Sequence, residues 1–248
     1  MSSSRKILII GATSAMARAT AAAFARCGAS LYLAARDTDE AARIATDLAV
    51  RYQVSADFGK IDIAQTSGHA AFITQVIDVL GGLDGVVFAA GYMADQADAE
   101  QDFSLVENMV QVNYLGAMSV LDQCASYLQQ QKGGFIVGIS SVAGDRGRQS
   151  NFYYGSTKAA LSVYFSGLRN KLQPHGVHVM TVKPGFVDTA MTYGLRGMFL
   201  VASPESVGEK IAQAVSKKRN VVYLPWFWRY IMLIIRHIPE FLFKKLKL

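Results

Sequence analysis

The sequence predicts a single α/β domain whose parallel sheet is covered by helices on both faces, and three observations support this. Short apolar runs typical of buried strands alternate along the chain with longer segments typical of helices. The chain has 248 residues, of which 51% are hydrophobic, which is enough for one large core. The sequence contains no internal repeat, low-complexity run or Pro/Gly/Ser-rich linker that would mark a second domain.

The apolar runs, taken in chain order, give the expected strands. We expect seven: Lys6 to Ile10, Leu31 to Ala34, a weak one ending near Ile61, Gly85 to Ala90, Phe135 to Ile139, Val177 to Val182 and Val221 to Leu224. Seven strands with helices between them predict a doubly wound sheet of the Rossmann type. We expect residues 1–224 to form this domain and residues 225–248 to form an amphipathic, basic C-terminal tail.

The first expected strand runs into a loop that begins with glycine and leads into a helix. The loop reads GATSAMA, starting at Gly11. Backbone N–H groups of such a loop, together with the helix N-terminus, can bind the pyrophosphate of a dinucleotide. The candidate cofactor contacts in this loop are Gly11, Thr13, Ser14 and Met16.

The end of the second strand indicates which dinucleotide is bound. Domains of this type that use NAD carry an acidic residue there, which hydrogen-bonds the ribose hydroxyls. This chain has Ala35 followed by Arg36. A guanidinium can pair with the 2′-phosphate of NADPH, which an acidic side chain would repel. We therefore expect NADPH; the alternative is that Arg36 is a surface charge, partly neutralised by Asp37.

A serine, a tyrosine and a lysine follow the fifth strand at a spacing that suits carbonyl chemistry. The run GGFIVGI leads directly to Ser140 and Ser141, and Tyr154 and Lys158 follow within SNFYYGSTK. On a helix, Tyr154 and Lys158 lie on one face, so the ammonium can lower the pKa of the phenol. Ser141 can then polarise a substrate carbonyl while Tyr154 exchanges a proton with its oxygen. The pattern predicts a carbonyl reductase.

Lys183-Pro184-Gly185 follows the sixth strand. With this segment and the motifs above, the chain resembles the short-chain dehydrogenase/reductase family over nearly its whole length. The resemblance implies hydride transfer between a nicotinamide and a ketone carbon, with Lys158 also binding the nicotinamide ribose. It implies that Asn113 supports a proton relay through a bound water. It further implies a homo-dimer or tetramer whose faces are formed by residues 103–130 and 151–172.

The same resemblance extends the expected cofactor site. Asp62 and Ile63 match the position that contacts the adenine. This chain departs from the family where it has Ala15 and Ala17 in place of glycine and Ala89 in place of asparagine, and methyl groups in the first loop narrow the approach of the cofactor. The remaining implied contacts are Ala90, Gly91, Tyr154, Lys158, Pro184, Gly185, Val187 and Thr189.

Two arginines lie between the expected catalytic serine and tyrosine. Arg146 and Arg148 can face the substrate entrance, where a guanidinium would bind a phosphate. The alternative is an ordinary surface loop. The segment from Ala190 to Ser203 is expected to form a lid over the substrate.

The tail carries five cations, Arg229, Arg236, Lys244, Lys245 and Lys247, against the single carboxylate Glu240. Its apolar run is shorter than the roughly 20 residues that span a bilayer, so we expect no transmembrane helix. Pro239 is expected to divide it into two helices. Aromatic and aliphatic residues opposite a basic face suit a peripheral position on an anionic membrane. The alternative is packing against a neighbouring subunit.

The tail contains the segments RYIM at 229–232, RHIP at 236–239 and FKKL at 243–246. Together with SNFYYGSTKA, this tail pattern is similar to the decaprenylphosphoryl-2-keto-erythro-pentose reductases. That resemblance implies a polyprenyl-phosphoryl 2-keto-pentose as the substrate, a role in cell-envelope precursor synthesis and a flavin oxidase as a partner. Two alternatives stay open. One is a reductase of a free hydrophobic ketone, of steroid or acyl type; the other is a non-catalytic nucleotide-binding scaffold.

The cysteines, Cys27 and Cys124, show no metal-ligand spacing and are expected to be reduced packing residues. We therefore expect a cytoplasmic protein, peripheral on the inner face of the cell membrane, with no metal site and no nucleic-acid partner.

Overall fold

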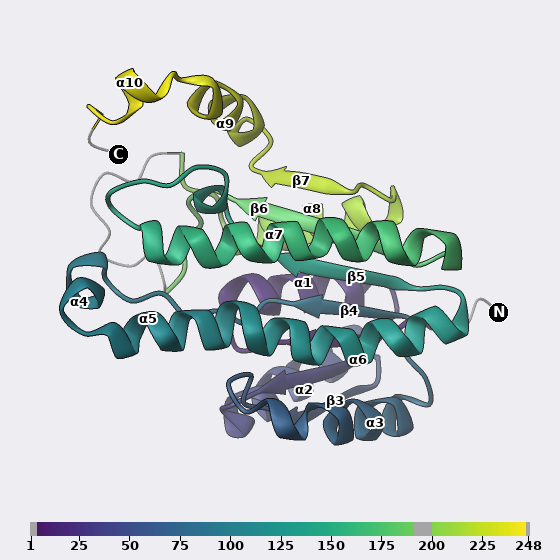
Figure 1. Cartoon of the computed structure of the whole chain (residues 1–248). Coiled ribbons are helices and arrows are strands. Elements are labelled where there is room, and N and C mark those ends of the chain that lie inside the picture. The colour runs from purple at the N-terminus through teal and green to yellow at the C-terminus, as the bar shows by residue number, and fades with distance from the viewer. Residues whose placement is uncertain (1–3, 191–199, 247–248) are drawn as a thin grey trace.

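A seven-stranded parallel sheet organises the computed structural model, which describes residues 4–190 and 200–246 (Figure 1). The strand order is β3-β2-β1-β4-β5-β6-β7, and every neighbouring pair is parallel. The predicted doubly wound fold is therefore confirmed. The strands are β1 (Lys6–Ile10), β2 (Ser30–Ala35), β3 (Ala56–Lys60), β4 (Gly85–Phe88), β5 (Phe135–Ile139), β6 (His178–Pro184) and β7 (Val221–Leu224).

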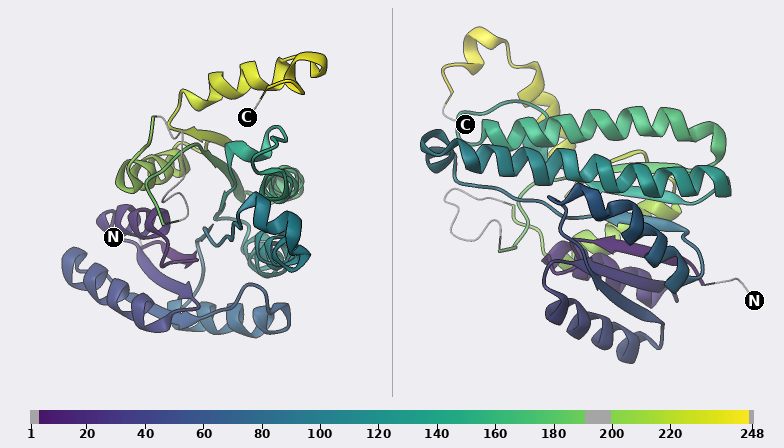
Figure 2. Two further views of the ribbon diagram at one scale, coloured as in Figure 1. Left: turned by 90° about the vertical axis from the view of Figure 1, so that its left-hand side faces the viewer. Right: turned by 60° about the horizontal axis from the view of Figure 1, so that its bottom comes forward.

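Helices cover both faces of the sheet, as the left panel of Figure 2 shows. One face packs against α1, α2 and α8, and the other against α3, α6 and α7. The helices are α1 (Ala15–Arg26), α2 (Thr38–Tyr52), α3 (His69–Leu80), α4 (Gln96–Gln101), α5 (Phe103–Val110), α6 (Gly116–Gln131), α7 (Phe152–Leu172), α8 (Pro204–Ser216), α9 (Trp228–His237) and α10 (Glu240–Phe243).

Alternation along the buried strands divides the core between these two layers. In β1, Leu8 and Ile10 face α3, α6 and α7, while Ile7 and Ile9 face α1 and α8. All four side chains are fully buried. A strand covered on both faces must be apolar at every position, which is why its sequence is a continuous apolar run.

The strands β3 and β6 differ from the prediction in instructive ways. β3 is the outermost strand on its side, and only some of its residues need to be apolar, so its ADFGK sequence predicted it weakly. β6 continues through Pro184, which we expected to follow the strand. Proline is tolerated there because it is the final residue and lacks only a backbone donor.

The tail folds into α9 and α10, with the predicted break at Pro239. Trp228 and Met232 of α9 are buried and pack with Val142 of the same chain. Within residues 4–190 and 200–246, no helix combines the length and the apolar character needed to cross a bilayer. The expected lid and Lys247 fall mostly or wholly outside the described residues.

Candidate active site

Most of the predicted site residues follow β1, β2, β3, β4, β5 and β6, at the carboxyl ends of these parallel strands (Figure 1). Tyr154 and Lys158 lie on α7, and Asn113 lies in the helical turn before α6. The direction of winding reverses between β1 and β4, which are adjacent in the sheet. Ligands of doubly wound sheets bind in the crevice at this reversal.

The loop after β1 lies directly against the loop after β4. Gly11 has a φ of +78°, and a Cβ atom there would lie 2.5 Å from the backbone nitrogen of Ala90. Its N–H group and that of Ala12 both donate to the carbonyl of Ala34, at 2.9 and 3.1 Å. Only glycine fits this position, because both the dihedral angle and the contact exclude a side chain.

The start of α1 is capped by Ser14, whose hydroxyl accepts a hydrogen bond from Ala17 N at 3.2 Å. The methyl group of Ala17 is buried in the core between α1 and the sheet. The close helix approach in this region is made instead by Gly208 of α8, where a Cβ atom would lie 2.4 Å from the Ala19 carbonyl carbon. The methyl group of Ala17, at a position where the family usually has glycine, therefore fits within the helix packing.

Arg36 is exposed at the end of β2, and no hydrogen bond or ion pair holds it in the described part of the chain. Asp37 caps α2 by accepting from Glu40 N at 2.9 Å. The Asp37 carboxylate is thus committed to the helix N-terminus, whereas the guanidinium next to it remains available to an anion.

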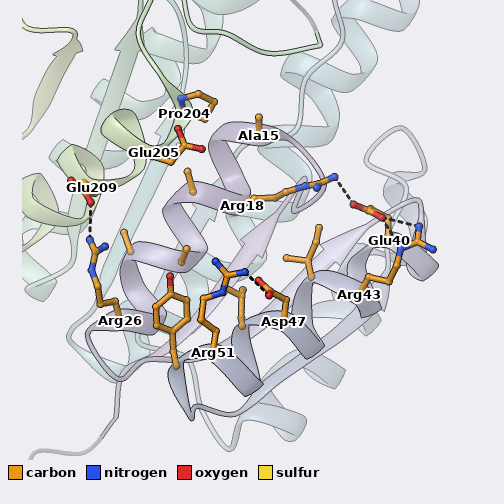
Figure 3. Close-up of a pocket in the computed structure, with 16 residues that line it drawn as sticks. Ala15, Arg18, Arg26, Glu40, Arg43, Asp47, Arg51, Pro204, Glu205 and Glu209 are labelled. Atoms are coloured by element: carbon orange, nitrogen blue, oxygen red, sulfur yellow. Dashed lines mark hydrogen bonds and ion pairs between the residues drawn. The ribbon is translucent and has the colours of Figure 1, made fainter.

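A groove of about 650 Å³ runs between α1, α2 and the start of α8, outside the expected cofactor site (Figure 3). Its arginines are held in ion pairs: Arg18 and Arg43 with Glu40 at 2.5 and 2.8 Å, Arg51 with Asp47 at 2.7 Å, and Arg26 with Glu209 at 3.1 Å. None of the predicted catalytic residues lines it. We therefore do not assign the chemistry to this groove.

The two serines after β5 have different partners. The hydroxyl of Ser140 is buried and donates to the Lys158 carbonyl at 2.9 Å, with the Ser162 hydroxyl 2.8 Å away. Ser141 accepts from Ala143 N at 3.1 Å and is hydrogen-bonded to the phenol of Tyr154. The structure brings Ser141, and not Ser140, to the tyrosine.

Tyr154 and Lys158 lie on the first turns of α7, as the spacing predicts. The Lys158 ammonium is 5.5 Å from the centre of the Tyr154 ring and donates to Ile139 O at 3.3 Å. Burial lowers the pKa of Lys158 to about 8. Burial also raises the pKa of Tyr154 to about 12, and the hydrogen bond from Ser141 opposes that shift.

The direction of the Tyr154 shift corrects the expectation of a lowered phenol pKa. The cost of removing the phenolate from water outweighs its stabilisation by the hydrogen bond from Ser141 in this structure. At neutral pH the phenol is therefore protonated, which is the form that gives a proton to a carbonyl oxygen.

Asn113 is fully buried in a π-helical turn (Gln111–Leu115) that precedes α6. Its amide oxygen accepts from Tyr92 N at 2.7 Å, and its amide nitrogen donates to Tyr92 O at 2.8 Å and to the Thr157 hydroxyl at 3.1 Å. Thr157 in turn donates to Tyr154 O at 2.8 Å. The side chain thus ties the loop after β4 to the helix of Tyr154, a role not predicted for it; the proton relay stays a prediction.

The remaining predicted cofactor residues line the same edge of the sheet. Asp62 accepts from Ala64 N at 3.0 Å, and Ile63 is buried directly against Gly116. Ala90 and Gly91 are partly buried after β4. After β6, the backbone N–H of Gly185 donates to Leu224 O at 2.9 Å. Val187 forms an isolated β-bridge with Ala202, and Thr189 is partly buried.

The arginines between Ser141 and Tyr154 face the tail. Arg146 donates to the carbonyls of Ile235 and Ile238, at 2.6 Å each, and forms an ion pair with Glu240 at 2.8 Å. Its guanidinium is therefore committed to α9 and α10, which corrects the expectation that it binds a substrate phosphate. Nothing in the sequence pairs these distant residues.

Arg148 lies next to the inner face of the tail. It contacts the sulfur of Met232 at 3.3 Å, and among the described residues its Nε has no hydrogen-bond partner. Burial lowers the pKa of Arg148, and the charge of Asp145 opposes that shift. A substrate contact for Arg148 stays a prediction.

Comparison with known proteins identifies the family. A family model described as short chain dehydrogenase matches residues 5–198, which is most of the chain. The chain belongs to the short-chain dehydrogenase family. Two similar relatives are uncharacterised oxidoreductases: one from Mycobacterium tuberculosis, 32% identical over 88% of both chains, and one from Streptomyces coelicolor, 33% identical over 98% of this chain and 96% of the other.

Solved structures of short-chain dehydrogenases share the fold. A crystal structure of actinorhodin polyketide ketoreductase with NADPH has a TM-score of 0.80 at 22% identity, covering 89% of this chain and 95% of that one. As a short-chain dehydrogenase, the chain is an NAD(P)-dependent oxidoreductase. The glycine-only approach at Gly11 and the capped N-terminus of α1 fit a dinucleotide bound at this edge.

Proposed function

We propose that this short-chain dehydrogenase reduces ketones with NADPH through Ser141, Tyr154 and Lys158. The observation that carries the proposal is the arrangement of three side chains: the partly buried phenol of Tyr154 is hydrogen-bonded to Ser141, and the Lys158 ammonium lies 5.5 Å from the centre of the Tyr154 ring. Bound NADPH would supply the hydride. Ser141 polarises the substrate carbonyl, Tyr154 donates its proton to the oxygen, and the charge of Lys158 stabilises the phenolate that remains.

The choice of NADPH is supported by the end of β2. Ala35 offers no carboxylate to the ribose, and the Arg36 guanidinium is exposed and unpaired within the described residues. Asp62, after β3, would lie on the adenine side, and Lys158 would bind the nicotinamide ribose. A 2′-phosphate would give Arg36 the anionic partner that it lacks among the described residues.

Replacing Arg36 with glutamine is expected to raise the KM for NADPH by about 10- to 100-fold, since a hydrogen bond to a charged group contributes roughly 1.5–3 kcal/mol. The KM for NADH should change little. Steady-state kinetics with both cofactors checks this. Arg51→Gln is the matched control, because Arg51 is an exposed arginine paired with Asp47 on α2. Equal losses with NADPH and NADH would contradict the assignment.

We propose a polyprenyl-phosphoryl 2-keto-pentose as the substrate, reduced to the sugar alcohol form for cell-envelope synthesis beside a flavin oxidase. The exposed side chains of residues 226–246, here termed the tail outer face, support a lipid-linked substrate. Its large apolar residues are exposed: Trp226, Tyr230, Leu233, Ile234, Phe241, Leu242 and Leu246. Exposed cations accompany them: Arg229, Arg236, Lys244 and Lys245.

Such a surface suits the interface of an anionic bilayer, because apolar side chains enter the headgroup boundary while cations meet anionic lipids. The polyprenyl chain of the substrate would be held in the same bilayer. We therefore propose that the protein binds peripherally to the inner face of the cell membrane.

The double substitution of Trp226 and Ile234 by serine is expected to weaken binding to anionic vesicles at least about tenfold, because a buried large apolar side chain contributes roughly 1.5–3 kcal/mol. Both side chains are about two-thirds exposed, at 66% and 68%. Sedimentation with phosphatidylglycerol vesicles checks this. Val50→Ser, at an equally exposed apolar residue of α2, should change nothing. Unchanged sedimentation of the double variant would contradict membrane docking.

Exposed apolar residues on α5 and α7 support a second proposal, that the protein forms a homo-dimer or tetramer. Phe103, Phe152 and Val163 are exposed on the two helices that family resemblance places at subunit faces. If the tail outer face also packed on a neighbouring subunit, the protein would suit a free hydrophobic ketone as its substrate. Vesicle sedimentation distinguishes this alternative, because a tail buried in an oligomer would not bind lipid.

The reductase assignment itself is tested by NADPH consumption with a panel of ketones: a steroid ketone, an acyl ketone and a keto-sugar. Turnover of one or more supports the proposal. No turnover of any ketone, with NADPH still bound, would instead support a non-catalytic nucleotide-binding scaffold.

A further inference from the structure

The inner face of α9 contacts both loops that frame the catalytic residues. Met232 and Trp228 pack with Val142, which follows Ser141 in the β5–α7 loop. Trp228 also lies against the turn after β6, where a Cβ atom on Gly185 would be 1.9 Å from its indole nitrogen. Figure 1 shows the β5–α7 loop next to the yellow tail helices. The tail thus packs against both loops of the active site.

Arg146 makes the polar part of this contact. Its side chain is only 14% exposed, and it reaches the carbonyls of Ile235 and Ile238 at the end of α9, where helix carbonyls lack intrahelical donors. It also pairs with Glu240 and stacks 3.6 Å from the centre of the Phe243 ring. One guanidinium therefore holds the two helices together across Pro239.

The residue before Arg146 fixes the same loop to the sheet. The buried carboxylate of Asp145 accepts hydrogen bonds from Lys183 of β6 and from Tyr223 of β7, the latter at 2.7 Å. Consecutive residues thus tie the loop that joins Ser141 to Tyr154 to the sheet on one side and to the tail on the other. Of these two residues, only Arg146 makes contacts that depend on where the tail lies.

Among the described residues, α10 is tied to the rest of the protein mainly through the contacts of Arg146 with Glu240 and Phe243. It is four residues long, far below the length at which an isolated helix is stable, and its Phe241 and Leu242 are exposed. Insertion of these side chains into a bilayer would favour the folded α9–α10 arrangement that surrounds Arg146. A bilayer would thus bind the folded α9–α10 tail more tightly than a tail in which α10 is unfolded. Such a difference in affinity is what shifts the population between two states.

We propose that Arg146 is a positioning residue that couples docking of the tail outer face on an anionic bilayer to the placement of Ser141 and Tyr154, so that membrane binding raises turnover. This inference rests on the proposed reductase function and on the proposed membrane docking. The coupling acts on catalysis and not on cofactor binding. Arg146 contacts the tail, and the loop between Ser141 and Tyr154 carries no residue that is predicted to bind NADPH.

The test uses the full-length protein and a water-soluble ketone, whose concentration vesicles do not change. With phosphatidylcholine vesicles containing phosphatidylglycerol, the kcat of the wild type should rise by about five- to tenfold, while the KM for NADPH stays constant. Phosphatidylcholine alone should have little effect. Arg146→Met should sediment with anionic vesicles yet show no rise in kcat, and Arg146→Lys should recover part of it.

Glu240→Gln gives the same information without disturbing a buried side chain, because Glu240 is 77% exposed. It removes the only carboxylate of the tail, so it should bind anionic vesicles at least as tightly as the wild type and yet be stimulated less. Arg229→Gln, on the outer face, should bind vesicles more weakly and keep the activity measured without lipid.

Two results would overturn the inference: equal stimulation of the wild type, Arg146→Met and Glu240→Gln, or vesicle binding without stimulation of the wild type. Either leaves the reductase assignment intact, since both are measured on an active enzyme. Absence of ketone turnover in every sample would instead overturn the proposed function, and the inference with it.

Discussion

Replacing Tyr154 with phenylalanine is expected to abolish ketone reduction while NADPH still binds. The change removes one oxygen, the proton donor that is hydrogen-bonded to Ser141, and leaves the ring in place beside Lys158. A positioned general acid contributes about 10²–10⁴-fold to rate, so turnover should fall by at least that amount. Steady-state rates, with NADPH affinity measured by fluorescence titration, check both halves of this prediction.

The neighbouring tyrosine provides the matched control. Tyr153 is partly buried on the same turn of α7, with its ring centre 4.5 Å from that of Phe152, and it has no predicted role. Tyr153→Phe should keep most of the activity. If Tyr154→Phe retained a large fraction of wild-type turnover, the phenol would not be the proton donor and the mechanism would fail.

Replacing Gly11 with alanine is expected to destabilise the protein and to remove tight NADPH binding. A side chain at a left-handed backbone position costs about 1–2 kcal/mol, and overlap with packed atoms adds roughly 1–3 kcal/mol. The overlapped atoms are the Ala90 backbone at 2.5 Å, so relief of the overlap must move one of the two loops that form the cofactor site. Urea unfolding and NADPH titration measure the two effects.

Gly28 separates the two causes. It has nearly the same dihedral angle, a φ of +80°, but a Cβ atom there meets nothing within 4 Å. Gly28→Ala should therefore show only the backbone cost, about 1–2 kcal/mol, with normal NADPH affinity. Equal stability and equal NADPH affinity in the two variants would show that the close approach of Gly11 to Ala90 does not shape the site.

The fold was predictable because its signals are local. A strand buried on both faces needs an unbroken apolar run, and β1 and β5 show such runs; β3, at the sheet edge, does not and was predicted only weakly. The pairing of Tyr154 with Lys158 was predictable for the same reason, since four residues on a helix bring two side chains to one face.

What the sequence did not predict depends on distant contacts. Arg146 meets carbonyls 89 and 92 positions away, and no spacing rule connects them. The direction of the Tyr154 pKa shift depends on how deeply α7 is packed, which pattern alone does not give. The tail was expected to face either lipid or a neighbouring subunit, whereas its inner face packs on its own chain through Trp228 and Met232.

The most direct test of the proposed function is the rate of NADPH oxidation with a polyprenyl-phosphoryl 2-keto-pentose in anionic vesicles, set beside the free keto-sugar and a steroid ketone. The proposal predicts a strong preference for the lipid-linked sugar, and loss of this activity in Tyr154→Phe. Equal rates on the free ketones, or rates on those alone, would contradict the lipid-linked substrate and leave a general carbonyl reductase.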